Sequence, residues 1–314
     1  MENLETIAPM ATTGSPIVTF KKLFLPSAAI QNFYIMGSPT AGNEIYVTQR
    51  KAKDTYLSRC IIQSDKTAVC VDYAILVDYG HGESLEVNTY GGVTYIWLGY
   101  SAHDDYPKYY WARQVARVQY VKTNTAVGST PAETTVTGRK SLNNMRRATS
   151  DGTPLEVGEI KRVAVAIADG SDRIGFRVQL KSDNIYYCIY DLSDVNAHLS
   201  NMSTTSTSME NMTAAWKATV PCNVLPNGSF QGFDMTGVGT GNKFLYLIGG
   251  GSGDTPKINK VLYTNGGNYT NEGTTTITNT TLEVEGIQIL GNYLYFALDS
   301  GASDTTSIYR ITTP

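Results

Sequence analysis

Charged residues and long apolar runs are scarce in this chain, and each scarcity excludes a class of protein. Charged side chains make up 17% of its 314 residues and the net charge is −3, so the basic footprint of a nucleic-acid-binding protein is missing. No apolar run approaches the roughly 20 residues that a membrane-spanning helix needs. The acidic start at Met1–Glu5 also lacks the basic and then apolar segments of a secretory signal peptide.

Cysteine and histidine are few, and their spacing matches no metal site. There is no CxxC pair, and the cysteines fit no zinc pattern: Cys60, Cys70, Cys188 and Cys222. Cys60 and Cys70 could face each other across a hairpin. Buried free thiols are favoured over a disulfide there, because cysteine is often a small core residue. GxSxG, Walker and HExxH motifs are absent, so we expect no enzyme activity, no cofactor and no bound metal.

Tyrosine and glycine are frequent, with 21 and 29 copies, and they fall into a weak internal repeat. Each unit has three strand-length runs of four to eight residues separated by turn residues. Five units can be recognised. Their first runs cover 31–35, 83–87, 162–166, 231–235 and 285–289. Their second runs cover 44–48, 94–98, 174–178, 243–247 and 292–296, and their third runs 55–60, 112–118, 185–189, 258–262 and 307–311.

This repeat predicts an all-β fold, a five-bladed β-propeller closed by an N-terminal strand. A small sheet with two apolar faces cannot bury both alone, whereas radial stacking buries them and leaves short edges. The last unit lacks one strand, which Pro16–Leu25 can supply. We therefore expect an N-terminal arm over residues 1–15 and a single propeller domain over 16–314. A sandwich, a solenoid, or a sixth blade within 122–160 are the alternatives, and Ser206–Thr219 has the spacing of a helix.

In a propeller, the loops that precede the innermost strands open on the same face as the loops between the second and third strands of each blade. Binding residues gather in loops that a rigid scaffold holds. Here that face would collect the loops 50–54, 79–82, 101–110, 181–184, 249–256 and 300–306. The second unit contributes the richest set. We expect its ligand-binding residues to be His81, Tyr100, His103, Asp104, Asp105, Tyr106 and Trp111. Aromatic rings can stack on the apolar face of a sugar while the polar groups bind its hydroxyl edge.

Each of these residues also has a purely structural interpretation. His81 lies between two glycines. It could be a polar contact to a ligand or a metal ligand near the axis, or its ring could only form hydrogen bonds to neighbouring strands. The aromatic rings of the 100–111 loop could instead pack onto their own blade. Asp104 and Asp105 are adjacent acids, which is a weak indication of glycoside hydrolysis.

The first two units resemble the signature of phage receptor-binding β-propellers. The similar segments are Asn43–Gln49, Tyr56–Arg59, Tyr79–Val87, Gly91–Trp97 and Ala112–Tyr120. The same signature occurs in the teichoic-acid-biosynthesis-protein-C group and in helveticin-J-type bacteriocins. The resemblance is specific over about residues 30–121, and beyond them it rests on the shape of the repeat.

This resemblance implies a five-bladed propeller that binds a cell-wall glycopolymer such as teichoic acid. Of the residues that the family uses for binding, only His81 carries over to this sequence as a motif residue. The function expected first is a receptor-binding protein of a phage tail, which would act in a virion or outside the cell with tail proteins or copies of itself as partners. A helveticin-type secreted bacteriocin is the alternative, and a glycopolymer hydrolase is the least favoured. Without a signal peptide, we expect release by lysis or within a particle.

Overall fold

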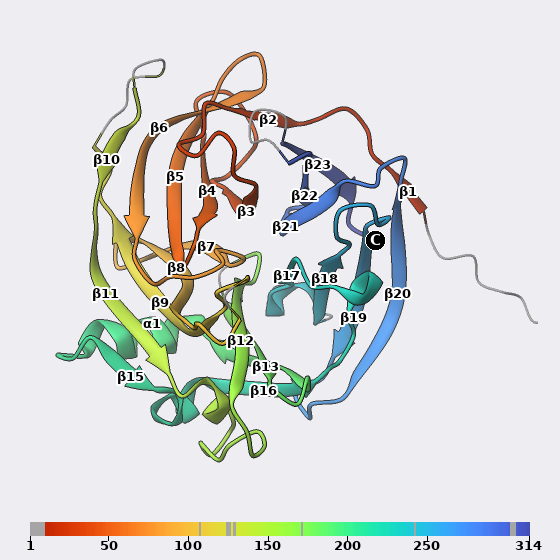
Figure 1. The fold of residues 1–314 in the computed structure, drawn as a ribbon. Coiled ribbons are helices and arrows are strands. Elements are labelled where there is room, and N and C mark those ends of the chain that lie inside the picture. The colour runs from red at the N-terminus through yellow and green to blue at the C-terminus, as the bar shows by residue number, and fades with distance from the viewer. Residues whose placement is uncertain are drawn as a thin grey trace, which may run out of the picture.

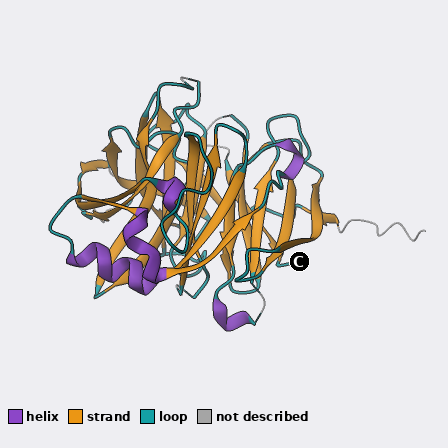
Figure 2. Ribbon diagram, turned by 90° about the horizontal axis from the view of Figure 1, so that it is seen from below, coloured by secondary structure: helices purple, strands orange, loops and turns teal. Residues whose placement is uncertain are grey.

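The computed structural model describes residues 10–106, 108–123, 127, 130–170, 172–241, 243–301 and 306–314. Most of the predicted N-terminal arm, residues 1–9, lies outside the described residues, as do residues 302–305 of one predicted surface loop. Most of the regular secondary structure of the described chain is β-strand (Figures 1 and 2). The predicted all-β class is therefore confirmed.

The strands form five groups of antiparallel neighbours that follow one another along the chain. The first group contains β3 (Ile30–Ile35), β4 (Glu44–Lys51), β5 (Asp54–Ile62) and β6 (Thr67–Leu76). The second contains β7 (Leu85–Tyr90), β8 (Val93–Ala102), β9 (Ala112–Tyr120) and β11 (Val136–Asn143). The third contains β12 (Ile160–Ile167), β13 (Arg173–Leu180), β14 (Ile185–Asp191) and β16 (Trp216–Pro221).

The last two groups draw strands from the N-terminal part of the chain. The fourth contains β17 (Gly232–Met235), β18 (Phe244–Gly249), β19 (Lys257–Tyr263) and β20 (Tyr269–Thr278), with β1 (Met10–Thr12) parallel to β20. The fifth contains β21 (Glu283–Leu290), β22 (Tyr293–Asp299), β23 (Ser307–Thr312) and β2 (Val18–Lys21). Because β2 also pairs in parallel with β6, the fifth and first groups form one nine-stranded sheet.

The first strands of the five groups form a ring around the centre of the molecule (Figure 1). β3 contacts β7, β7 contacts β12, β12 contacts β17, β17 contacts β21, and β21 contacts β3. An apolar core fills the space between each neighbouring pair of groups. In the core between the second and third groups, Trp97 packs with Val163 and Phe176. Each sheet is thus apolar on both faces, which forces the groups to pack side by side.

Helical structure is short, and its position differs from the prediction. Ser206–Thr219 is not one helix: it contains β15 (Ser206–Ser208), the 3-10 helix η2 (Met209–Ala215) and the start of β16. Met209 and Met212 are buried, but the residues that follow pair with β14 and belong to a sheet. The α-helix lies earlier, at α1 (Leu192–Asn201). Its start was recognisable, because the Asp191 side chain caps the backbone N–H of Asp194.

The segment considered for a sixth blade adds strands to existing groups. β10 (Ala132–Thr134) pairs with β6, and β11 pairs with β9 and β15. Three further 3-10 turns complete the secondary structure: η1 (Met145–Arg147), η3 (Pro226–Gly228) and η4 (Val238–Thr240). All four cysteines are free and buried, as favoured from the sequence, although Cys60 and Cys70 are cross-strand partners in β5 and β6.

Candidate ligand-binding cavity

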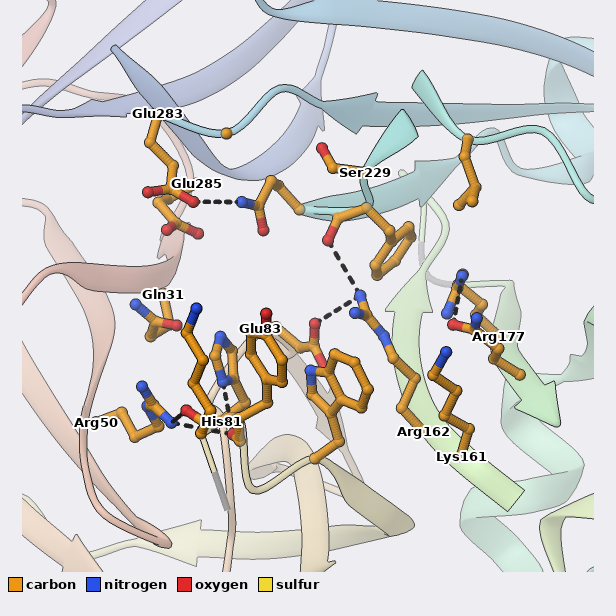
Figure 3. Close-up of a pocket in the computed structure, with 18 of the residues that line it drawn as sticks. Gln31, Arg50, His81, Glu83, Lys161, Arg162, Arg177, Ser229, Glu283 and Glu285 are labelled. Atoms are coloured by element: carbon orange, nitrogen blue, oxygen red, sulfur yellow. Dashed lines mark hydrogen bonds and ion pairs between the residues drawn. The ribbon is translucent and has the colours of Figure 1, made fainter. Parts of the chain in front are cut away.

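A cavity of about 860 Å³ opens at one end of the ring of first strands. Every strand group contributes to its lining (Figure 3). The contribution is regular, because the polar residue that begins the first run of each repeat unit lines the cavity: Gln31, Glu83, Arg162, Gln231 and Glu285. The repeat therefore places an equivalent polar side chain from all five units around one space.

A buried ion pair joins two of these positions. The Arg162 guanidinium lies 2.7 Å from the Glu83 carboxylate, and the two residues are 7% and 6% exposed. Arg162 also donates to the backbone carbonyl of Phe230 at 3.0 Å and lies over the rings of Trp111 and Phe230. Burial lowers the pKa of Arg162 to about 10, against the opposing effect of Glu83. The pair links the second, third and fourth strand groups.

Arg177 is a second buried cation on the same wall, and no carboxylate pairs with it within the described chain. It is fully buried, lies 4.0 Å from the centre of the Phe230 ring, and donates to Gln179 at 3.1 Å. Its Nε and Nη1 atoms have no hydrogen-bond partner among the described residues. Burying a guanidinium without a counter-ion costs free energy. The free N–H groups of Arg177 could therefore donate hydrogen bonds to an acceptor on a ligand.

The opposite wall is acidic (Figure 3). Glu283 accepts a hydrogen bond from Gln231 at 2.7 Å. Glu285 is 5% exposed, and its carboxylate makes no hydrogen bond or ion pair within the described residues. Burial raises the pKa of Glu283 and raises that of Glu285 well above its usual range, with the neighbouring acids adding to both effects. Among the described residues, no cation forms an ion pair with Glu283 or Glu285, just as no carboxylate forms one with Arg177 on the opposite wall.

His81 lies at the cavity edge in a defined orientation. Its Nδ1 atom is 2.7 Å from the carbonyl oxygen of Tyr109, so Nδ1 carries the hydrogen and Nε2 is left as the acceptor. Burial lowers the pKa of His81, which keeps the ring neutral. Arg50 holds the same loop, because its Nη1 donates to the carbonyl oxygens of Lys108 and Tyr109 at 2.8 and 3.1 Å.

An aromatic stack forms the rim between the second and third groups. The rings of Tyr109 and Trp111 are parallel within 7° and their centres are 4.6 Å apart. Tyr106 packs against the other side of this stack at 5.1 Å from Trp111. Lys161 lies over both Tyr106 and Trp111, at 5.8 and 5.6 Å. The rim therefore presents flat apolar surface beside charged and amide groups.

The structure brings some of the predicted site residues to the cavity and others elsewhere. His81 and Trp111 line it, and Tyr106 contacts it through Trp111. Tyr100 instead packs against Tyr79 with Arg139 over its ring, and Asp104 is exposed outside the lining.

Asp105 and His103 form a separate ionic cluster. Asp105 lies 2.7 Å from each of His103, Arg113 and Lys181, and these contacts hold its pKa far below the usual range. The cluster attaches the loop to the third strand group, which is a structural role. Within the described ranges, no three histidine, cysteine, aspartate or glutamate side chains are grouped so that they could bind a metal ion.

Several cavity residues were not predicted, although the sequence contains a signal for them. Glu83, Arg162 and Glu285 occupy the same position in the second, third and fifth repeat units. Comparing that position between units would have selected a ring of polar residues. Arg177 has no such signal, because it lies within the second strand of its unit, where alternate residues are normally core.

The fold and the cavity together define an all-β protein whose repeated sheets enclose a central polar pocket. The chain belongs to the bacteriocin helveticin-J family, whose profile matches residues 30–313. No match was found among curated proteins. The described helices include none long and apolar enough to span a membrane.

Among solved structures, the chain is similar to the tail fiber of Staphylococcus aureus phage P68, with 14% identity and a TM-score of 0.51. The match covers 94% of this chain and 51% of the tail fiber, so the chain spans about half the length of that protein. More distant similarities are to the NanB sialidase of Streptococcus pneumoniae (9% identity, TM-score 0.38, covering 86% and 35%) and to Drosophila Semaphorin 1a extracellular domains 1–2 (10% identity, TM-score 0.37, covering 94% and 66%).

Proposed function

We propose that the chain is a five-bladed β-propeller that binds a cell-wall glycopolymer in its central cavity. The five strand groups, their contacting first strands and the five apolar cores between them support this architecture. β2 would complete the last blade through its antiparallel pairing with β23. The N-terminal strand would then close the ring, which matches the role expected for residues 16–25.

The aromatic rim beside the charged cavity carries the proposal for the ligand. A sugar has apolar C–H faces, which stack on aromatic rings, and hydroxyl edges, which bind charged and amide groups. Trp111 and Tyr109 supply the rings, and Gln31 and Arg177 supply polar groups from other blades. A cavity of about 860 Å³ is within the range of ligand sites. A polyanionic wall polymer such as teichoic acid would also meet the cationic wall at Arg162 and Arg177.

The setting that we propose is a phage tail, where the protein would recognise the host surface as part of a virion. The similarity in fold to a phage tail fiber supports this assignment. Tail proteins or further copies of the chain would be its partners, and many copies would raise the effective affinity. The family supports an alternative, a bacteriocin released from the cell. Only a bacteriocin would kill sensitive cells as purified protein.

We propose binding without turnover. The adjacent acids that could have indicated a hydrolase are not arranged for it, because Asp105 is held in three ion pairs and its pKa is far below the range of a general acid. Incubation with cell walls should therefore release no soluble sugar. Release that is lost in His81→Ala would favour the hydrolase instead.

The first experiment is a pull-down on Gram-positive cell walls before and after acid removal of teichoic acid. Binding that disappears with the teichoic acid is the expected result. Binding that is unchanged on stripped walls, or absent across a broad panel of strains, would contradict the proposed ligand.

A further inference from the structure

The cavity holds a buried guanidinium and a buried carboxyl group on opposite walls, and neither has a counter-ion among the described residues. Arg177 on β13 is fully buried, and its Nε and Nη1 atoms have no hydrogen-bond partner among the described residues. Glu285 on β21 is 5% exposed and forms no ion pair with a described residue. Figure 3 shows the two side chains on different sides of the open centre. Neither can satisfy the other across that space. Arg177 keeps a hydrogen bond to Gln179 and a contact with the Phe230 ring, but neither Arg177 nor Glu285 has a counter-ion to offset its desolvation within the described chain.

The side chains near Arg177 include further cations, and the side chain beside Glu285 is a second acid. Arg162 and Lys161 lie on the same wall as Arg177, although Glu83 and Asp183 pair with them at 2.7 and 2.5 Å. Glu283 lies beside Glu285, and its carboxyl group accepts a hydrogen bond from the Gln231 amide instead of pairing with a cation. Arg50 is the cation that opposes the rise in the pKa of Glu285. Its Nη1 atom, however, already donates hydrogen bonds to the backbone carbonyls of residues 108 and 109.

We propose, resting on the function above, that the cavity takes a polymer unit carrying both an anionic group and a primary ammonium. The anionic group, a phosphate or carboxylate, would accept hydrogen bonds from Arg177. The ammonium would donate to Glu285 and Glu283 on the opposite wall. The planar guanidinium of Arg177 matches the geometry of an oxyanion. An ammonium has three N–H donors, and of the two carboxyl groups on the opposite wall only that of Glu283 already accepts a hydrogen bond, from Gln231. A neutral sugar would supply neither an anion for Arg177 nor a cation for Glu285.

The test compares binding to untreated cell walls, to the same walls after their free amines are acetylated with acetic anhydride, and to walls stripped of teichoic acid. The proteins are wild type, Glu285→Gln and Glu272→Gln. Glu272 is an exposed acid on β20, so its substitution makes the same charge change away from the cavity. Each variant is checked for a cooperative melting transition, which shows that it is folded.

Acetylation should weaken binding of wild type and Glu272→Gln by about tenfold or more, the effect of losing one hydrogen bond to a charged group. Glu285→Gln should bind both kinds of wall equally. Arg177→Met should weaken binding to every kind of teichoic-acid-bearing wall and keep the dependence on acetylation. Equal wild-type binding to untreated and acetylated walls would overturn the ammonium site while leaving the proposed function intact. Equal binding to stripped walls would instead refute the function itself.

Discussion

Glu83→Gln tests the buried ion pair that joins three strand groups at the cavity. The substitution removes the negative charge that lies 2.7 Å from Arg162, while both residues remain about 6–7% exposed. Breaking a buried pair by removing one partner costs about 3–5 kcal/mol, because the other charge stays buried. Arg162 keeps its bond to the Phe230 carbonyl and two aromatic contacts. We therefore expect the lower end of the range, about 3 kcal/mol.

The assay is thermal melting followed by circular dichroism. For a domain of this size, about 3 kcal/mol corresponds to a melting temperature lowered by roughly 6 °C. The matched control is Lys53→Gln, which breaks the Lys53–Asp78 ion pair, whose side chains are 46% and 47% exposed; an exposed pair contributes little. If Glu83→Gln melts at the wild-type temperature, or if Lys53→Gln lowers the melting temperature by as much, then burial does not determine how strongly these ion pairs stabilise the protein, and the reasoning is wrong.

Three further predictions concern the scaffold. Gly286→Ala should destabilise the protein by about 2 kcal/mol more than Gly291→Ala in urea unfolding, because both glycines have positive φ but only the first new Cβ would clash, with Asn32; equal losses would contradict the close approach of the first and fifth strand groups. Glu86→Gln should raise the melting temperature at pH 8 and leave it unchanged at pH 4. Burial raises the pKa of Glu86 beside Asp234, so the wild type loses stability as pH rises from about 4.3 through that raised pKa; a gain at both pH values would refute the cause. All four thiols should resist a thiol reagent until the protein is denatured, since all are buried; rapid native reaction would show that the cores open.

The strands were predictable because alternation and turn residues are local signals. The runs 44–48 and 94–98, for example, fall inside β4 and β8. The helix was misplaced for the opposite reason. Met209, Met212 and Trp216 are spaced as on a helix, but Trp216 begins a strand that pairs with β14. That pairing depends on a sheet built from distant residues, which local periodicity does not report.

The site was predicted in part. A glycine-flanked histidine and an aromatic loop located His81 and Trp111 at the cavity. The same loop was expected to present Asp105, which instead forms ion pairs with Arg113 and Lys181 from different strand groups. Such contacts arise only when the sheets are packed. Whether the predicted residues bind a ligand remains a prediction.

The central claim is that a wall polymer binds in the central cavity, and Trp111→Ala tests it most directly. The measurement is the dissociation constant for Gram-positive cell walls of wild type, Trp111→Ala and Tyr269→Ala. Tyr269 is a 40% exposed aromatic residue on β20 and lies outside the lining. Removing a central aromatic anchor costs about 2 kcal/mol, so Trp111→Ala should bind about 30-fold more weakly and Tyr269→Ala as wild type does. Unchanged binding by a folded Trp111→Ala, or an equal loss in Tyr269→Ala, would contradict the claim.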